Sequence, residues 1–190
     1  MRAFVAVDLP TIVVDGIPSG SDAQPSHVTL EFLGDVPEAR AGEIAAALAD
    51  AAADVPPFDV AVSGVGAFPS TVHPRVVYVG VSVGGASLVA LARAVGEALR
   101  PLGFAPELRP FVPHVTLLRV RSPSHLRRAL TLLTHPPDVP PAVGRVTEVL
   151  LKASRLDPSG AVHHVIARFP LGTPRGASGG EPSVVQRRHR

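Results

Sequence analysis

The chain has 190 residues, of which 46% are hydrophobic and 18% are charged, and its formal net charge is +2. This composition fits one domain, or two small lobes with a core of Val, Leu and Ala, while the absence of cysteine excludes a disulfide scaffold, a thiolate metal site and a cysteine nucleophile. No apolar run approaches the roughly 18 residues that a membrane-spanning helix needs, so we expect a soluble, intracellular protein without membrane contact.

Strand and helix periodicities alternate along the chain and are separated by short segments rich in Pro, Gly, Ser and Asp. The predicted strands are apolar or alternate in polarity, whereas the predicted helices repeat apolar residues three or four positions apart. In chain order the pattern predicts a strand at 4–7, a loop at 10–25, a strand at 27–33, a helix at 38–53, a strand at 58–62, a loop at 64–74, a strand at 75–83, a helix at 86–102, a strand at 114–120, a helix at 122–134, and strands at 143–153 and 162–169.

This order of elements predicts an α+β chain with two similar halves, which together form one domain over residues 1–171. Residues 172–190 are rich in Gly, Pro, Ser and Arg and show no apolar periodicity. Such a segment cannot bury enough apolar surface to offset its ordering entropy, so we expect a disordered Arg-containing tail. Within the body, residues 100–128 carry six Arg and one acid. A patch of this kind suits a phosphate-bearing ligand, and a solvated surface is the alternative interpretation.

An internal repeat is the most informative feature of the sequence. The tetrapeptide His27-Val28-Thr29-Leu30 recurs as His114-Val115-Thr116-Leu117, with one copy in each half of the chain. Each copy is entered through a proline, Pro25 or Pro113. A single strand histidine of this kind is usually an ordinary half-buried residue, but the repetition of the whole tetrapeptide favours a shared function.

The alternation of a strand determines what the repeat presents. Side chains two residues apart share a face and lie about 7 Å from one another, so the His and Thr of each copy point together while Val and Leu point into the core. If the halves are related by a pseudo-two-fold axis, His27 and Thr29 meet His114 and Thr116 in one groove.

Two facing imidazoles suit in-line displacement at phosphorus. One imidazole removes a proton from the nucleophile while the other protonates the leaving oxygen, and both have ordinary pKa values of about 6.5. The threonine hydroxyls can donate to the non-bridging oxygens, where negative charge develops. A zinc site is the rival interpretation, but neither tetrapeptide contains an acid or a typical ligand spacing, so we expect no metal and no cofactor.

With one such motif in each half, the sequence resembles the 2H phosphoesterase superfamily. The most similar branch is the LigT type, the RNA 2′,3′-cyclic phosphodiesterases that are also called 2′-5′ RNA ligases. The resemblance implies two pseudo-symmetric lobes, each an antiparallel sheet with outer helices, flanking a central cleft. It also implies metal-independent hydrolysis of RNA 2′,3′-cyclic phosphate ends to 2′-phosphomonoesters. Four segments carry it: RAFVAVD at 2–8, HVTLEFLGD at 27–35, VGAFP at 65–69 and FVPHVTLLR at 111–119.

The resemblance assigns roles to five residues. It implies that His27 protonates the departing O3′, that His114 activates water, and that Thr29 and Thr116 bind the phosphate. Arg119 matches a basic position near the substrate base or phosphate. In a regular strand, however, Arg119 would face away from His114, so this role needs a bulge or a strand end.

Several alternatives stay open. Ligation forming a 2′-5′ linkage is the reverse chemistry, a related cyclic phosphate or a 2′-5′ oligonucleotide is another substrate, and an RNA-binding module on the same fold is the non-enzymatic alternative. His163 could reach the cleft, but its place beside His164 on a strand favours a structural role. Segment 9–26 is shorter than the corresponding segment of this family usually is, and it contains no aromatic residue. We expect a cytoplasmic monomer that acts on RNA ends or small nucleoside cyclic phosphates.

Overall fold

The computed structural model describes residues 1–10, 12–14, 17–18, 26–105, 108–136, 142–157 and 160–172. The predicted tail lies outside the described residues except for Gly172, and so does most of segment 9–26. Within the part of the chain that the structure describes, no helix is both long and apolar enough to cross a membrane.

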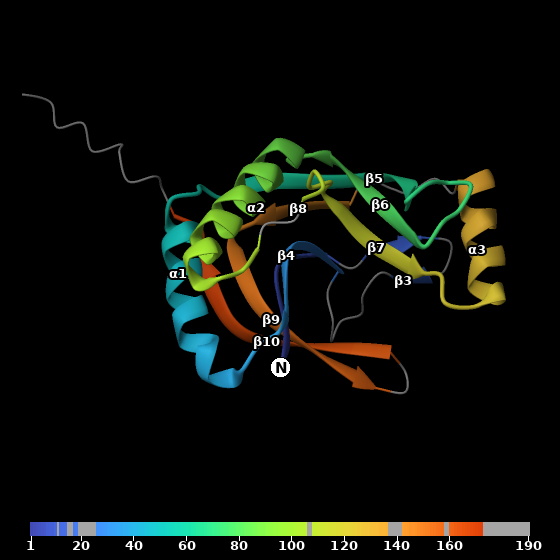
Figure 1. The fold of residues 1–190 in the computed structure, drawn as a ribbon. Coiled ribbons are helices and arrows are strands. Elements are labelled where there is room, and N and C mark those ends of the chain that lie inside the picture. Colours follow the sequence, from blue (N-terminus) through green and yellow to red (C-terminus); the bar gives the residue numbers. More distant parts are fainter. Residues whose placement is uncertain are drawn as a thin grey trace, which may run out of the picture.

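The described elements alternate as the sequence predicted (Figure 1). Two short 3₁₀ turns, η1 (Glu38–Arg40) and η2 (Arg100–Leu102), extend the first helix at its start and the second at its end. The helices are α1 (Ala41–Ala53), α2 (Gly85–Leu99) and α3 (Pro123–Thr134). The strands are β1 (Arg2–Leu9), β2 (Val13–Val14), β3 (Ile17–Pro18), β4 (Ser26–Asp35), β5 (Phe58–Phe68), β6 (Val76–Val83), β7 (His114–Arg119), β8 (Ala142–Val146), β9 (Glu148–Asp157) and β10 (Gly160–Pro170).

Three predictions differ from the structure. The predicted loop at 10–25 contains the short paired strands β2 and β3. Strand β5 continues to Phe68, through residues that were predicted as loop, because Gly64 adopts a positive φ of 73° and forms a bulge that lets the ladder with β6 resume. The single strand predicted at 143–153 is two strands, since β8 pairs with β5 whereas β9 pairs with β1. The chain changes neighbours at Thr147, and no Gly or Pro stands at this position to mark the change.

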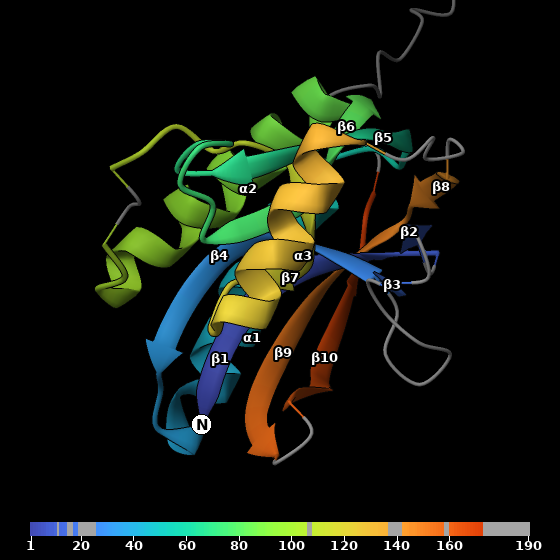
Figure 2. The same cartoon turned by 90° about the vertical axis from the view of Figure 1, so that its right-hand side faces the viewer.

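Eight antiparallel strands follow the order β10-β9-β1-β4-β7-β6-β5-β8. The first four make one lobe and the last four make the other. The lobes join through β4 and β7, where one residue pair, Val28 with Val115, bridges the two strands. The α+β class and the two antiparallel halves are therefore confirmed, with the halves continuous in one curled sheet (Figure 2).

The helices cover the lobes on two sides. Helix α1 packs against α2 and β10, α2 also packs against β4, and α3 packs against β5 and β7 at the opposite end of the molecule (Figure 1). Apolar residues three or four apart form the buried stripes, for example Leu88, Leu91, Val95 and Leu99 of α2. Helix α2 starts directly after β6 at Gly84, whose φ is 80° and where a β-carbon would run into a backbone carbonyl oxygen, so only glycine fits this junction.

Candidate active site

The two repeats form the matching central strands of the sheet. His27 and Thr29 on β4 are half-buried, while Val28 between them is fully buried. On β7, His114 and Thr116 are likewise half-buried, with their apolar neighbours in the core. The predicted alternation is therefore observed in both copies, and each strand presents an imidazole and a hydroxyl on one face.

The strand pairing brings the two copies together. Because β4 and β7 are antiparallel and paired at Val28 and Val115, both His–Thr faces lie on the same side of the sheet. The antiparallel direction places His27 toward Thr116 and Thr29 toward His114. Approximate two-fold symmetry therefore relates the two His–Thr faces, and we call the side of the sheet that carries them the cleft face.

A bulge in β7 places Arg119 on this face. In the β6–β7 ladder Tyr78 pairs with Thr116 and Val77 with Leu118, so Leu117 is the additional residue. The bulge reverses the alternation, and Arg119, which pairs with Val76, shares the face of Thr116. The requirement for a bulge that followed from the sequence is therefore met.

The same bulge occurs in the other copy of the repeat. In the β1–β4 ladder Ala6 pairs with Thr29 and Val5 with Glu31, which skips Leu30. Phe32 then takes the place that Arg119 has in the second copy. Its side chain is 66% exposed, so the first lobe presents an aromatic ring where the second presents a guanidinium.

His114 lies in an aromatic cluster, and a hydrogen bond fixes the tautomer of its imidazole. Its ring centroid is 5.0 Å from that of Phe68 and 5.3 Å from that of Tyr78. Its Nδ1–H donates to the carbonyl oxygen of Val112 at 2.7 Å, which leaves Nε2 as a proton acceptor. Burial lowers the pKa of His114 and the charge of Arg119 lowers it further, against the opposing effect of the hydrogen bond. A lowered pKa favours the neutral imidazole, which is the form that a general base needs.

His27 lies in a different cluster. Its ring centroid is 5.5 Å from that of Phe4 and 5.2 Å from that of His163, with the two imidazoles nearly perpendicular. Phe4 and His163 are themselves 5.0 Å apart. On the same face, the ammonium of Lys152 forms an ion pair with Asp8, and the Lys152 side chain is only 4% exposed.

His163 also reaches this face. The sequence analysis named it as able to reach the cleft but favoured a structural role, and the structure places its ring against that of His27. One histidine on a strand carries no sequence signal for this contact, because the contact depends on how the sheet curls.

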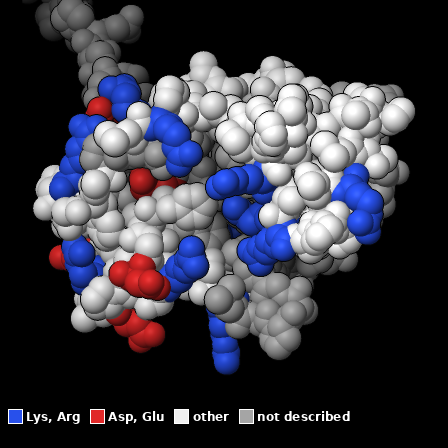
Figure 3. Space-filling model, turned by 45° about the vertical axis from the view of Figure 1, so that its right-hand side comes forward, with Lys and Arg blue, Asp and Glu red and all other residues white. Residues whose placement is uncertain are grey.

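Positive charge collects beside the imidazoles. Partial burial lowers the pKa of Arg119, and the charges of Arg121 and Arg2 lower it further, so the three guanidinium groups act on one another electrostatically. They come from both lobes, since Arg2 is on β1. Figure 3 shows several Lys and Arg side chains side by side near the middle of one face. This distribution suits a phosphate-bearing ligand.

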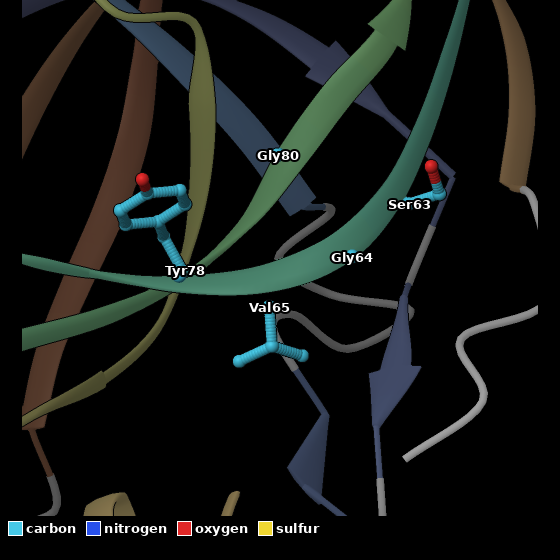
Figure 4. Close-up of a pocket in the computed structure, with 6 residues that line it drawn as sticks. Ser63, Gly64, Val65, Tyr78 and Gly80 are labelled. Atoms are coloured by element: carbon cyan, nitrogen blue, oxygen red, sulfur yellow. The ribbon is translucent and has the colours of Figure 1, made fainter. Parts of the chain in front are cut away.

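A shallow hollow of about 230 Å³ lies next to His114, between β5 and β6. Gly80 pairs with His114, and Tyr78 contacts its ring. A β-carbon on Gly66 would come within 2.5 Å of the Tyr78 ring, so glycine is required for that ring to lie flat on the strand. Tyr78 and Ser63 stand on one side of the ribbon (Figure 4). The residues lining the hollow are Ser63, Gly64, Val65, Gly66, Tyr78 and Gly80.

Among the described residues, no group of three or more His, Cys, Asp or Glu side chains is arranged to hold a metal ion. The predicted site residues do come together on the described strands. His27, Thr29, His114, Thr116 and Arg119 all lie on one face of the central strands β4 and β7.

The family model of the 2′-5′ RNA ligase superfamily matches residues 16–155. The chain belongs to this superfamily. A superfamily member named RNA 2′,3′-cyclic phosphodiesterase, from Methanothermobacter thermautotrophicus, is 33% identical over 184 residues, which cover 90% of this chain and 99% of that protein. A protein of the same name from Aquifex aeolicus is 35% identical over 153 residues, 80% of each chain.

Solved structures place the chain in the same superfamily fold. A crystal structure of a protein from Thermus thermophilus superposes with a TM-score of 0.68 at 26% identity, over 91% of this chain and 99% of the other. The structure of E. coli LigT complexed with 3′-AMP gives a TM-score of 0.68 at 25% identity, over 90% and 97% of the two chains. The family resemblance stated from the sequence is confirmed.

Proposed function

We propose that this chain is an RNA 2′,3′-cyclic phosphodiesterase that hydrolyses cyclic phosphate ends to 2′-phosphomonoesters without a metal ion. The observation that carries the proposal is the pair of His–Thr motifs on one face of adjacent strands, in two chemically different environments. The relatives from M. thermautotrophicus and A. aeolicus bear the name of this activity. The catalytic unit is the single bilobal domain of residues 1–171.

The environment of each imidazole supports its role. Nε2 of His114 accepts a proton from water, and the resulting hydroxide oxygen attacks phosphorus as the P–O3′ bond breaks. His27 in its protonated form donates a proton to O3′, so that a 3′-hydroxyl and a 2′-phosphomonoester result. The lowered pKa of His114 and its bond to Val112 suit the base.

Three further residues handle the charge of the phosphate. The hydroxyls of Thr29 and Thr116 donate to the two non-bridging oxygens, where negative charge grows in the transition state. Arg119 stands on the same face as Thr116 and supplies a permanent positive charge. The proposed substrates are RNA ends or small nucleoside cyclic phosphates, bound by a monomer in the cytoplasm.

Ligation is the second candidate, because the same groups serve a different nucleophile. If a 5′-hydroxyl replaces water, His114 removes its proton, the new P–O5′ bond forms and the P–O3′ bond breaks, which gives a 2′-5′ linkage. The hollow of about 230 Å³ beside His114 is the candidate place for the nucleoside of this nucleophile, because Gly80 in its lining pairs with His114.

A direct assay tests the proposal. The purified protein is incubated with a nucleoside 2′,3′-cyclic phosphate in excess EDTA, and the product is identified by phosphorus NMR. We expect turnover to a 2′-phosphomonoester, with little activity in His27→Ala or His114→Ala. Formation of a 3′-phosphomonoester contradicts the assigned roles, and loss of activity in EDTA that one metal restores contradicts the metal-free mechanism. Binding without turnover supports the RNA-binding alternative.

A further inference from the structure

His163 and His27 come together from distant strands. In the order β10-β9-β1-β4 they are three strand spacings apart, which is about 14 Å in a flat sheet. Their ring centroids are nevertheless 5.2 Å apart. The curl of the sheet therefore brings the two side chains over β1 and β9, where Phe4 completes a cluster of three rings.

The strand register also places His163 on the cleft face. His163 pairs with Ser154 on β9, Ser154 pairs with Arg2 on β1, and Phe4 lies two residues further along β1. Paired residues share a face in an antiparallel sheet, so His163 faces the same side as Phe4. His164 takes the other face of the strand and is exposed.

The ring of His163 has a polar partner on the adjacent strand β9. Its Nδ1 lies 3.0 Å from the hydroxyl oxygen of Ser154, which fixes the orientation of the imidazole. Lys152, which forms an ion pair with Asp8, lies two residues from Ser154 on β9 and so shares this face. The hydrogen bond with Ser154 restricts the rotation of the His163 ring, so the ring can support the His27 imidazole that contacts it.

We propose that His163 is a positioning residue for His27, and that its ring-to-ring contact holds the His27 imidazole in the orientation from which it protonates the leaving oxygen. The proposal depends on the proposed function only for the role of His27 as the acid. The contact itself can be measured without any turnover.

The charge state of His163 fits this role. Burial lowers its pKa, and the charges of Lys152 and Arg119 lower it further, with a smaller contribution from His164, while Asp8 opposes them. A neutral ring beside His27 avoids the repulsion that a second imidazolium would exert on the protonated acid.

The kinetic experiment compares His163→Ala, His163→Phe and the matched control His164→Ala on the neighbouring residue. Misplacement of a reacting group by about 1 Å can cost about 10²-fold in rate, so we expect His163→Ala to lower kcat at least about tenfold. The KM for the cyclic nucleotide should stay within about twofold, since the phosphate ligands are unchanged. His163→Phe restores the ring contact and should recover most of kcat, and His164→Ala should match the wild type.

Other kinetic outcomes overturn the proposal. A wild-type kcat in His163→Ala shows that the contact is not needed. A raised KM in both His163 variants, with no rescue by Phe, shows that His163 contacts the substrate itself. Ser154→Ala is a second test, because it leaves the ring in place but frees it, and we expect a smaller fall in kcat than in His163→Ala.

An NMR measurement separates this proposal from the proposed function. In the wild type we expect a nuclear Overhauser effect between the ring protons of His27 and His163, and in His163→Ala we expect the His27 ring signals to shift and broaden. No such effect in the wild type, or unchanged His27 signals in the variant, overturns the positioning role. If the wild type turns over no cyclic phosphate, the proposed function fails while this measurement still decides the contact.

Discussion

The two copies of the tetrapeptide are identical in sequence and in strand position, but their surroundings differ. His114 has two aromatic neighbours and a backbone carbonyl that fixes its tautomer, whereas His27 has a second imidazole and a buried ion pair nearby. The repeat therefore supplies two equivalent groups, and the other strands of each lobe give them different surroundings, on which the proposed division into base and acid depends.

The shared bulge makes the same point at the edge of the site. Leu30 and Leu117 are both skipped by their ladders, and the residue two positions later turns onto the cleft face in each lobe. That residue is Phe32 in the first lobe and Arg119 in the second. The same β-bulge in both lobes thus presents the apolar ring of Phe32 in the first lobe and the positive charge of Arg119 in the second.

The largest expected effect comes from removing each of the two imidazoles. Positioned acid–base catalysis contributes roughly 10²–10⁴-fold for each group, so His27→Ala and His114→Ala should each lower kcat at least about 10²-fold. Because both groups act in one step, the double variant should be little worse than the poorer single one. Steady-state kinetics measures all three, and a near wild-type kcat in either single variant would leave that copy with only a structural role.

Changing the two bulge residues tests the asymmetry at the edge of the site. A charge-assisted hydrogen bond contributes about 1.5–3 kcal/mol, so Arg119→Gln should lower kcat/KM for a nucleoside cyclic phosphate roughly 10–100-fold. Phe32→Ala at the equivalent position is the matched control, and it should have a much smaller effect on the same substrate. Equal effects of the two substitutions would argue against a phosphate-binding role for Arg119.

A Gly66→Ala substitution tests the aromatic surroundings of His114. An added methyl group collides with the Tyr78 ring, and overpacking of this kind costs about 1–3 kcal/mol of unfolding free energy. Gly42→Ala is the control, because Gly42 lies in α1 with nothing within 4 Å of the new β-carbon. It should stabilise the protein slightly, by about 0.5–1 kcal/mol. Denaturant unfolding measures both, and a neutral Gly66→Ala would mean that Tyr78 can move aside.

The pH profile gives the smallest and most specific effect. The base works when neutral, so kcat/KM should rise with pH as His114 loses its proton, with a midpoint below the ordinary value of about 6.5 because its pKa is lowered. Arg119→Gln removes one cause of that lowering and should move this limb to higher pH. A limb that stays in place would show that the charge of Arg119 does not act on His114.

Local patterns predicted the parts of the site that lie within one strand. The face shared by His27 and Thr29 follows from an alternation of two, and the helices follow from apolar residues three or four apart. The face on which Arg119 lies could not be predicted in this way. Leu117 and Leu118 are both apolar, so the sequence does not show where the alternation is interrupted by the bulge. The contact of His163 with His27 was also hidden, since it spans the sheet and depends on its curvature.

The order of the strands has a consequence for the synthesis of the chain. The second lobe is built from β5 to β8, a continuous stretch of the sequence, whereas the first combines β1 and β4 with β9 and β10 from the other end. On the ribosome, the lobe that carries His114 can therefore assemble while the other still waits for its last two strands. The lobe that carries His27 is completed only when β10 emerges, so the site remains incomplete until nearly all of residues 1–171 have been made.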